Sequence, residues 1–252
     1  MSTYQHPQQP TYGLIGHPVS HSFSPDFFNE KFKREKIPAA YRAFDLPDIR
    51  QLPALIAQYP ELKGLNVTIP HKENVQAYLD DLSADAKAIG AVNCIAIRQG
   101  KLTGYNTDWM GFWESLAPLL QPWHRQALIL GSGGASKAVQ YALKQHGISF
   151  QVVSRSKKEG ALPYEALDEK LLQSHTLLIQ TTPLGMWPDV AAAPPLPYHL
   201  LGKNHLLYDL IYTPAETLFL QKGKAAGARI KNGLEMLELQ ALASWQIWQG
   251  SR

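Results

Sequence analysis

The sequence predicts a two-domain α/β protein, with an N-terminal α/β domain at 1–107 and a parallel-sheet domain at 108–233. First, short apolar runs alternate with helical segments along the 252 residues, which is typical of strands joined by crossover helices. Second, a glycine turn at 131–136 lies between an apolar run and a helix. Third, the helix 234–248 has an apolar stripe that we expect to pack on the first domain, so that 234–252 rejoins it.

The first half of the chain alternates expected strands and helices. The strands are 12–16, 41–46, 64–69, 92–97 and 101–105, and the helices are 25–36, 49–58, 73–82 and 109–120. Ser24 is a candidate N-cap of the first helix, since Pro25 then occupies its first turn. Gln99 and Gly100 between the last two strands predict a hairpin.

The second half repeats a strand-helix unit. Its expected strands are 127–130, 150–153, 176–180, 205–209 and 228–230, with helical segments between them, the first over 137–143. This alternation predicts a parallel sheet that helices cover on both faces.

Composition narrows the class of protein. The chain is 45% hydrophobic, with 24 basic and 21 acidic residues and a net charge of +3. It can bury a sizeable core, so a disordered protein is excluded. The basic residues are scattered apart from 31–34 and 157–158, whereas a nucleic-acid partner usually requires a denser stripe. The polar start, 1–10, has no apolar signal segment, and no run approaches the roughly 18 apolar residues of a membrane span. We therefore expect a cytoplasmic protein without a membrane or nucleic-acid partner.

Cysteine and histidine give no sign of a metal site. The single cysteine, Cys94, lies in an apolar segment and is expected to be a buried, inert thiol. The nine histidines are scattered, and His17, His21 and His71 show no ligand spacing. We expect no metal.

Four polar clusters follow or precede the strands of the first half, at 20–25, 66–73, 90–93 and 105–108. The ends of strands are where α/β proteins place their sites. Together the clusters supply hydroxyls, amides, one lysine and one aspartate, which suit a small, highly hydroxylated anion. Each cluster also has a plainer explanation. Ser22 and Ser24 can cap a helix, Lys72 can be a surface charge, and Asp108 can cap the helix at 109.

The glycine turn predicts a cofactor site. Gly131 permits the tight turn and Gly133 lets a pyrophosphate approach the backbone at the start of a helix, while Ser136 occupies the third small position. An NAD enzyme usually has an acidic residue after the second strand. Here 151–158 has none and contains Arg155, which favours NADP because arginine binds a phosphate bidentately.

At these residues the chain resembles shikimate dehydrogenase. The resemblance covers nearly the whole chain, from Gly13 to Gln240, and its motifs occur in family order. They are Ser22-Phe23-Ser24-Pro25, Asn66-Val67-Thr68-Ile69-Pro70-His71-Lys72, Gly90-Ala91-Val92-Asn93, Asn106-Thr107-Asp108, Gly131-Ser132-Gly133-Gly134-Ala135-Ser136, Thr182-Pro183-Leu184-Gly185-Met186, Tyr208-Asp209-Leu210-Ile211-Tyr212 and Asn232-Gly233-Leu234-Glu235-Met236-Leu237.

The resemblance implies reduction of 3-dehydroshikimate to shikimate with NADPH, in the pathway to chorismate and the aromatic amino acids. It implies a substrate domain and a Rossmann-type cofactor domain with the site in the cleft between them. Lys72 and Asp108 would be catalytic. Ser22, Ser24 and Thr68 would hold the substrate carboxylate together with Tyr212, and Asn66, Asn93, Asp108 and Gln240 would bind the ring hydroxyls. The residues expected at the cofactor are Gly131, Ser132, Gly133, Gly134, Ala135, Ser136, Ser154, Arg155, Ser156, Lys158, Thr182, Pro183, Leu184, Met186 and Gly233.

Two segments depart from the family pattern. Ser154-Arg155-Ser156 stands where many relatives have Asn-Arg-Thr, and Gln180-Thr181-Thr182 where many have Asn-Ala-Thr. Two alternative functions stay open. One is a quinate/shikimate dehydrogenase that uses NAD, and the other is a non-catalytic ligand sensor, which would not need to keep both Lys72 and Asp108. The sequence is compatible with a monomer or a homodimer.

Overall fold

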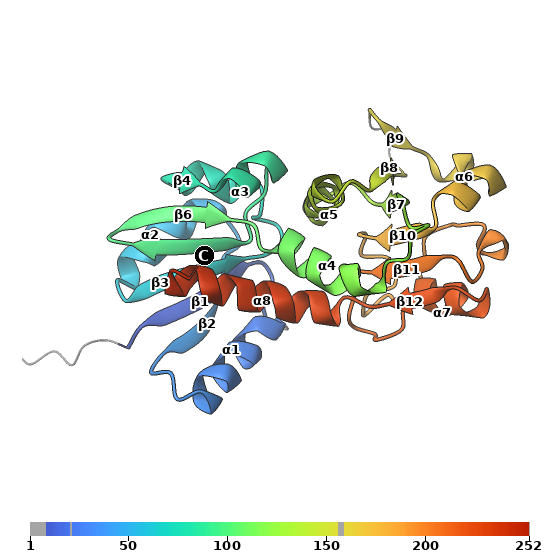
Figure 1. Ribbon diagram of the computed structural model, residues 1–252. Helices are drawn as coiled ribbons and strands as arrows, with labels where there is room; N and C mark the ends of the chain where they lie inside the picture. Colours follow the sequence, from blue (N-terminus) through green and yellow to red (C-terminus); the bar gives the residue numbers. More distant parts are fainter. Residues whose placement is uncertain (1–8, 21, 156–158, 252) are drawn as a thin grey trace, which may run out of the picture. The chain divides into compact units, whose positions relative to one another are not determined.

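The computed structural model describes residues 9–20, 22–155 and 159–251 and divides the chain into two compact units. Unit 1 comprises residues 1–107 and 241–252, and unit 2 comprises 108–240 (Figure 1). Each unit is built on its own six-stranded sheet. The predicted α/β class is confirmed. Of the segment 234–252, which we expected to rejoin the first domain, residues 241–252 belong to unit 1, whereas 234–240 belong to unit 2.

The sheet of unit 1 is mixed and has the order β2-β1-β3-β5-β6-β4. Its strands are β1 (Thr11–Gly16), β2 (Ala40–Asp45), β3 (Leu62–Val67), β4 (Asp81–Leu82), β5 (Cys94–Arg98) and β6 (Lys101–Tyr105). β1 pairs in parallel with β2 and β3, whereas β5 is antiparallel to β3 and β6. The β5–β6 hairpin turns at Gln99 and Gly100, both at positive φ, the geometry that suits a two-residue turn.

Helices cover both faces of this sheet. They are α1 (Phe23–Arg34), α2 (Leu52–Gln58), α3 (Ala84–Ile89) and the end of α8 (Leu234–Gln249), with 3₁₀ turns η1 (Ile49–Gln51) and η2 (Asn74–Tyr78). Alternate strand residues pack on opposite faces: Ile15 contributes to the core under α2, and Leu14 to the core under α1 and α8. The end of α8 lies beside the strands of this sheet (Figure 1). Trp248 of α8 donates a 2.9 Å hydrogen bond from Nε1 to the carbonyl of Ile95, which anchors this end of the helix on the sheet.

The sheet of unit 2 is entirely parallel, with the order β12-β11-β10-β7-β8-β9. Its strands are β7 (Gln126–Leu130), β8 (Ser149–Val153), β9 (Ala161–Leu162), β10 (Leu177–Gln180), β11 (Leu206–Asp209) and β12 (Arg229–Lys231). Its helices are α4 (Asp108–Leu116), α5 (Gly134–Gln145), α6 (Glu169–Ser174), α7 (Leu218–Ala225) and the start of α8, with 3₁₀ turns η3 (Ala117–Leu119), η4 (Tyr164–Ala166) and η5 (Tyr198–Leu200). One core lies under α4 and α5 and the other under α6 and α7, so the prediction of a parallel sheet covered on both faces is confirmed.

The structure corrects two local predictions. Residues 73–82, predicted as one helix, form η2 and then β4, because the backbone of Asp80 and Ser83 pairs with β6 at Leu102 and Gly104. The N-cap of α1 is Ser22 rather than Ser24, and Ser24 lies buried within the first turn. Two short elements, α3 and β9, were not predicted.

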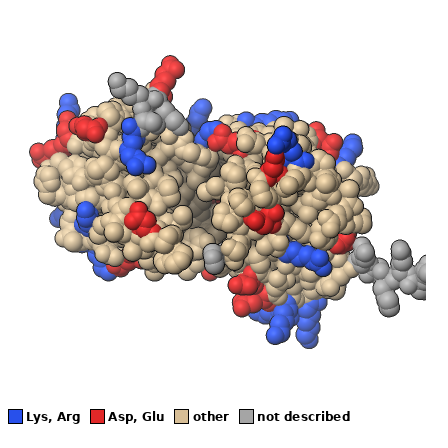
Figure 2. All heavy atoms as spheres, turned by 180° about the vertical axis from the view of Figure 1, so that it is seen from behind, with Lys and Arg blue, Asp and Glu red and all other residues tan. Residues whose placement is uncertain are grey.

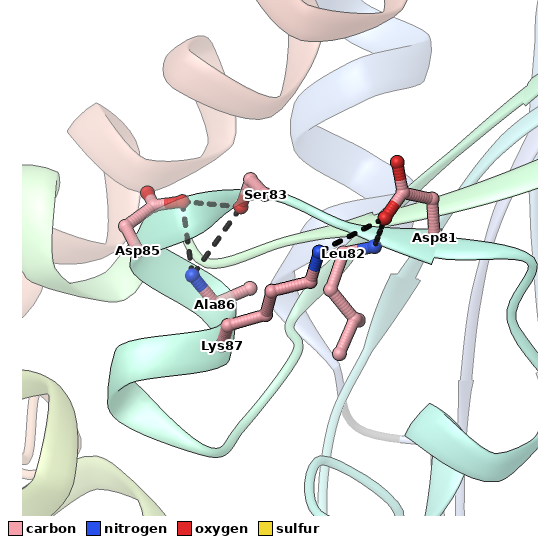
Figure 3. Close-up of polar contacts among 6 residues, drawn as sticks. All are labelled: Asp81, Leu82, Ser83, Asp85, Ala86 and Lys87. Atoms are coloured by element: carbon pink, nitrogen blue, oxygen red, sulfur yellow. Dashed lines mark hydrogen bonds and ion pairs between the residues drawn. The ribbon is translucent and has the colours of Figure 1, made fainter.

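The start of α3 is held by side chains (Figure 3). The Ser83 hydroxyl accepts a 3.3 Å hydrogen bond from the backbone nitrogen of Ala86 and donates to Asp85, whose carboxylate accepts a 2.9 Å bond from the same nitrogen. Lys87 forms a 3.1 Å ion pair with Asp81 on the neighbouring strand. The bonds from Ser83 and Asp85 satisfy the backbone nitrogen of Ala86, one of the donors that the first turn of a helix leaves without an intrahelical partner, and so support a helix of only six residues.

Basic and acidic side chains are interspersed over the face of the molecule in view in Figure 2. Among the described residues, no helix combines the length and apolarity needed to cross a bilayer.

Candidate active site

The polar clusters of unit 1 meet at one edge of its sheet. β1 and β3 are parallel, so the segments that follow them, which contain Ser22 and Lys72, leave from the same edge. β5 runs the other way and Cys94 pairs with Asn66, so Asn93 lies at this edge too. β6 ends beside Asn93 and brings Thr107 to the group. The strand order and directions therefore bring residues that lie far apart in the sequence to one edge of the sheet.

The turn after β3 packs closely on the end of β1. The backbone nitrogen of Thr68 donates a 2.9 Å hydrogen bond to the carbonyl of Ile15, and a Cβ on Gly16 would collide with the Thr68 side chain. The carbonyl of Lys72 accepts a 2.7 Å hydrogen bond from the nitrogen of Val92. The backbone on either side of Thr68 and Lys72 is thus fixed to neighbouring strands, while both side chains are partly exposed.

Asn66 is buried, 5% exposed, at the centre of a hydrogen-bond network. Its Oδ1 accepts a 2.8 Å bond from the hydroxyl of Tyr41. Its Nδ2 donates to the carbonyl of Asn93 at 3.2 Å and to Oγ of Ser244 at 2.9 Å. Burial raises the pKa of Tyr41 well above its usual range, which keeps its proton available for donation. The Ser24 side chain partly offsets this rise in the pKa of Tyr41, so two residues predicted at the substrate, Ser24 and Asn66, both act on the hydroxyl of this tyrosine.

Asn93 is held by Thr107. Its Nδ2 donates a 2.9 Å bond to Oγ1 of Thr107, and its Oδ1 accepts a 2.6 Å bond from the Thr107 backbone nitrogen. Oγ1 of Thr107 lies 3.1 Å from Oγ of Ser244, which connects the two asparagines through a pair of hydroxyls. Sequence reasoning found the asparagines but missed Tyr41 and Ser244 as their partners.

Unit 2 has a cavity of about 600 Å³ at the carboxyl ends of β7, β8 and β10. β7 is the strand from which the chain proceeds to β8 on one side and later to β10 on the other, and such a reversal is where α/β sheets bind ligands. The volume is within the range of small-molecule sites. The residues that line it are Gly131, Ser132, Gly133, Val153, Ser154, Arg155, Tyr164, Thr181, Thr182 and Pro183.

The glycine turn, through its residues 131–133, lines this cavity. Gly131 has φ +114, and a Cβ there would lie 2.6 Å from Oγ1 of Thr181, so the position requires glycine. Gly133 is the N-cap of α5, and a Cβ there would meet open space. The backbone at the start of α5 is therefore accessible to an anion, as the sequence predicts for a phosphate cradle.

Seven of the residues predicted at the cofactor line the cavity, and Arg155 brings a cation to it. Tyr164 also lines it, from the segment after β9, and the Arg155 charge partly offsets the rise that burial causes in the pKa of Tyr164. Sequence reasoning missed Val153, Tyr164 and Thr181. Gly134, Ala135 and Ser136 belong to the first turn of α5 behind the cradle. Ser156 and Lys158 lie outside the described residues.

Gln180 organises the segment that contains Thr182, Leu184 and Met186. It is fully buried, and its Oε1 accepts a 2.9 Å bond from the Thr182 hydroxyl while its Nε2 donates to the carbonyl of Leu184 at 3.2 Å. Met186 and the following Trp187 are 46% and 64% exposed. The longer glutamine, where many relatives have asparagine, thus supports this loop directly.

Asp209, at the end of β11, is fully buried. Its carboxylate accepts bonds from the nitrogen of Ile211 at 3.0 Å and the hydroxyl of Thr217 at 2.6 Å. Burial nevertheless raises its pKa to about 7. These bonds shape the turn that leads to Tyr212, and Gly233 supports the same turn, since a Cβ on it would overlap the backbone of Leu210.

The remaining predicted residues are divided between the units. Lys72 belongs to unit 1, whereas Asp108, Tyr212 and Gln240 belong to unit 2. Asp108 and Gln240 are buried, and Tyr212 is partly buried. Asp108 is the first residue of α4. The pairing of Lys72 with Asp108 stays a prediction.

Comparisons of the sequence and of the structure with known proteins all point to the same family. A model of the shikimate dehydrogenase substrate binding domain matches residues 14–95. The chain is 40% identical over 258 residues to a shikimate dehydrogenase (NADP(+)) of Methanococcus maripaludis, covering 94% of this chain and 91% of that protein. It is 41% identical over 248 residues to a protein of the same name from Clostridium beijerinckii, with the same coverage. The crystal structure of shikimate 5-dehydrogenase from Thermus thermophilus in complex with NADP(H) and shikimate matches with a TM-score of 0.85 at 34% identity, covering 95% of this chain and 93% of that one.

Proposed function

The chain belongs to the shikimate dehydrogenase family, and from this premise we propose that it catalyses the reversible NADPH-dependent reduction of 3-dehydroshikimate to shikimate, in the biosynthesis of chorismate and the aromatic amino acids. It is an oxidoreductase with NADP as its coenzyme. Unit 1 would bind the substrate and unit 2 the coenzyme. The observation that carries the proposal is that one chain has both kinds of site. Unit 1 has an edge rich in hydroxyls and amides, and unit 2 has a cavity lined by the glycine turn and by Arg155.

The edge of unit 1 suits a polyhydroxylated carboxylate. Ser22, Ser24 and Thr68 would surround the carboxylate with hydroxyl donors, and Tyr212 would add one from unit 2. Asn66, Asn93 and Gln240 would bind ring hydroxyls. Buried amides give specificity here, because a substrate that lacks the matching hydroxyl leaves a polar group without a partner.

Lys72 is the proposed proton donor. Reduction of a ketone develops negative charge on its oxygen, so an ammonium group at that oxygen stabilises the charge and then gives up a proton. In the reverse direction the amine takes the proton back from the shikimate hydroxyl. Asp108 would bind a hydroxyl of the ring and act with Lys72 in the proton transfer.

The cavity of unit 2 fits a dinucleotide phosphate. Gly133 leaves the backbone at the start of α5 open, and the first turn of α5 offers backbone donors and a favourable dipole to a pyrophosphate. Arg155 would bind the 2′-phosphate that distinguishes NADP from NAD. When bound, the nicotinamide supplies the hydride.

We further propose a cytoplasmic enzyme that acts on small molecules, as a monomer or homodimer, without nucleic-acid or membrane partners and without a metal. The test of the activity is direct. Purified protein is incubated with shikimate or quinate and with NADP or NAD, and the absorbance of the reduced nicotinamide is followed. Turnover of shikimate with NADP, far above quinate or NAD, is expected. Failure of the folded protein to oxidise shikimate with either coenzyme refutes the assignment. A preference for quinate and NAD would instead identify the protein as a quinate/shikimate dehydrogenase.

A further inference from the structure

Ser244 is a polar side chain on an otherwise apolar stretch of helix α8. It is fully buried, next to Ala241 and Trp248, which pack into the core of unit 1. Its Oγ accepts a 2.9 Å bond from Nδ2 of Asn66 and lies 3.1 Å from Oγ1 of Thr107. Ser244 also partly offsets the rise that burial causes in the pKa of the Cys94 thiol. A hydroxyl this deep in a core must have such partners, because an unpaired one costs about 1–3 kcal/mol.

The bonds of Asn66 determine which way its amide faces. Both hydrogens of Nδ2 are engaged, one by the carbonyl of Asn93 and one by Ser244, and Oδ1 accepts from Tyr41. An amide oxygen has two lone pairs, so the group that Asn66 presents to a ligand is the second lone pair of Oδ1. A ring hydroxyl would therefore donate to Asn66.

Ser244 helps to hold this amide in place. The hydroxyls of Tyr41 and Ser244 can either donate or accept, whereas the Asn93 carbonyl only accepts and therefore keeps the nitrogen on its side. Without the Ser244 hydroxyl, one amide hydrogen loses its acceptor, and the amide is held on that side by the Asn93 carbonyl alone. It can then tilt to find another partner, which moves the Oδ1 lone pair away from the position that the substrate needs.

We propose that Ser244 is a positioning residue for shikimate binding: it holds the amide of Asn66 directly and supports that of Asn93 through the Thr107 hydroxyl, and these two asparagines are the ones assigned to the ring hydroxyls. The proposal rests on the proposed function, since it assigns these asparagines to the substrate. Ser244 itself lies behind Asn66 and need not touch the ligand.

The test is a KM-against-kcat comparison in Ser244→Ala, with Ser115→Ala as a matched control. Ser115 is an equally buried helix serine, 1% exposed, whose hydroxyl lies 2.5 Å from that of Tyr208 in unit 2. Both variants lose one buried hydroxyl and both are expected to melt at a lower temperature than wild type. Only Ser244→Ala is expected to raise the KM for shikimate, by about 5–20-fold, with kcat within threefold and the KM for NADP unchanged.

Two results overturn the proposal. One is a wild-type KM for shikimate in folded Ser244→Ala, and the other is an equal rise in Ser115→Ala, which would show a general effect of lost stability. If Ser244→Ala fails to fold, Ser244→Cys is tested instead, because it keeps a side chain of similar shape, slightly larger, with a weaker hydrogen-bonding group. A smaller rise in KM is then expected, and its absence counts equally against the proposal. Wild-type protein that does not oxidise shikimate refutes the proposed function instead, so the two failures are distinguishable.

Discussion

The hydroxyl of Tyr41 donates a 2.8 Å hydrogen bond to Oδ1 of Asn66, inside a core where Tyr41 also stacks on Phe28 with ring centroids 4.6 Å apart. The ring is held by packing, so the hydroxyl is aimed at the amide without further ordering. This contact joins the aromatic core of unit 1 to the predicted substrate site.

Tyr41→Phe removes this donor and leaves the ring in place. Loss of the bond is expected to raise the KM for shikimate about threefold to tenfold with little change in kcat, as measured by steady-state kinetics. Tyr12→Phe is the matched control, because Tyr12 lies in the same aromatic core and its hydroxyl accepts only a 3.3 Å bond from Gln249 among the contacts described. Equal KM values in Tyr41→Phe and wild type would show that Asn66 does not need this donor.

Arg155→Ala is expected to weaken the binding of NADP much more than the binding of NAD. A bidentate arginine–phosphate contact consists of charge-assisted hydrogen bonds worth about 1.5–3 kcal/mol each, so the KM for NADP is expected to rise at least tenfold. The KM for NAD, which has no 2′-phosphate, is expected to change less than threefold.

Arg125→Ala serves as the control for this experiment. Arg125 is exposed and directly precedes β7, at the edge of the sheet opposite the cavity. It is expected to leave both KM values unchanged. A parallel loss for NADP and NAD in Arg155→Ala would mean that Arg155 supports the cavity rather than recognising the phosphate.

Asp209 makes the stability of unit 2 depend on pH. Its pKa is raised from 3.8 in the unfolded chain to about 7 in the folded protein, so the folded state binds the proton more tightly. Its contribution is fully present below pH 4 and is lost as the pH rises towards 7. Asparagine at this position cannot ionise. The free energy of unfolding of Asp209→Asn, relative to that of wild type, is therefore expected to increase by about 3 kcal/mol from pH 5 to pH 8.

Denaturant unfolding of both proteins at the two pH values measures this gain, and Asp189→Asn, at an exposed position of the same unit, is expected to show none. A difference between Asp209→Asn and wild type that does not vary with pH would show that the Asp209 carboxyl keeps an ordinary pKa.

The sequence predicted the repeating parts of the fold well and the short parts poorly. The strands β7, β10 and β11 are continuous apolar runs, and α5 and α8 have long amphipathic patterns, so local pattern and tertiary environment agree there. Residues 73–82 show why other predictions were wrong: Val75, Tyr78 and Leu82 have helical spacing, yet pairing with β6 prevails. α3 and β9 are too short for periodicity to reveal them.

The motifs of the sequence predicted the residues of the candidate site. They did not predict the residues that contact the site from distant parts of the chain. Ser22 and Ser24 are two residues apart, and only the structure shows that α1 begins at Phe23, which makes Ser22 the N-cap and places Ser24 inside the first turn. Tyr164 reaches the cavity from the short 3₁₀ turn η4, which carries no motif. Ser244 had one available signal, a polar residue on the apolar stripe of α8, but its partner Asn66 is 178 positions away in the chain.

Two variants address the proton transfer around Lys72. Asp108→Asn keeps the shape and any capping bond of Asp108 while removing its charge, so it separates a catalytic role from a cap, in which asparagine serves nearly as well. Lys87→Ala is the control for loss of a lysine in unit 1, because Lys87 of α3 is paired with Asp81 of β4 (Figure 3). This variant is expected to leave kcat unchanged.

The most direct measurement is kcat for shikimate oxidation by Lys72→Ala at saturating shikimate and NADP. Positioned acid–base groups typically contribute about 10²–10⁴-fold in rate, and kcat is expected to fall within that range while the protein stays folded and the KM for NADP is nearly unchanged. A kcat near that of wild type would contradict the assignment of Lys72 as the group that moves the proton.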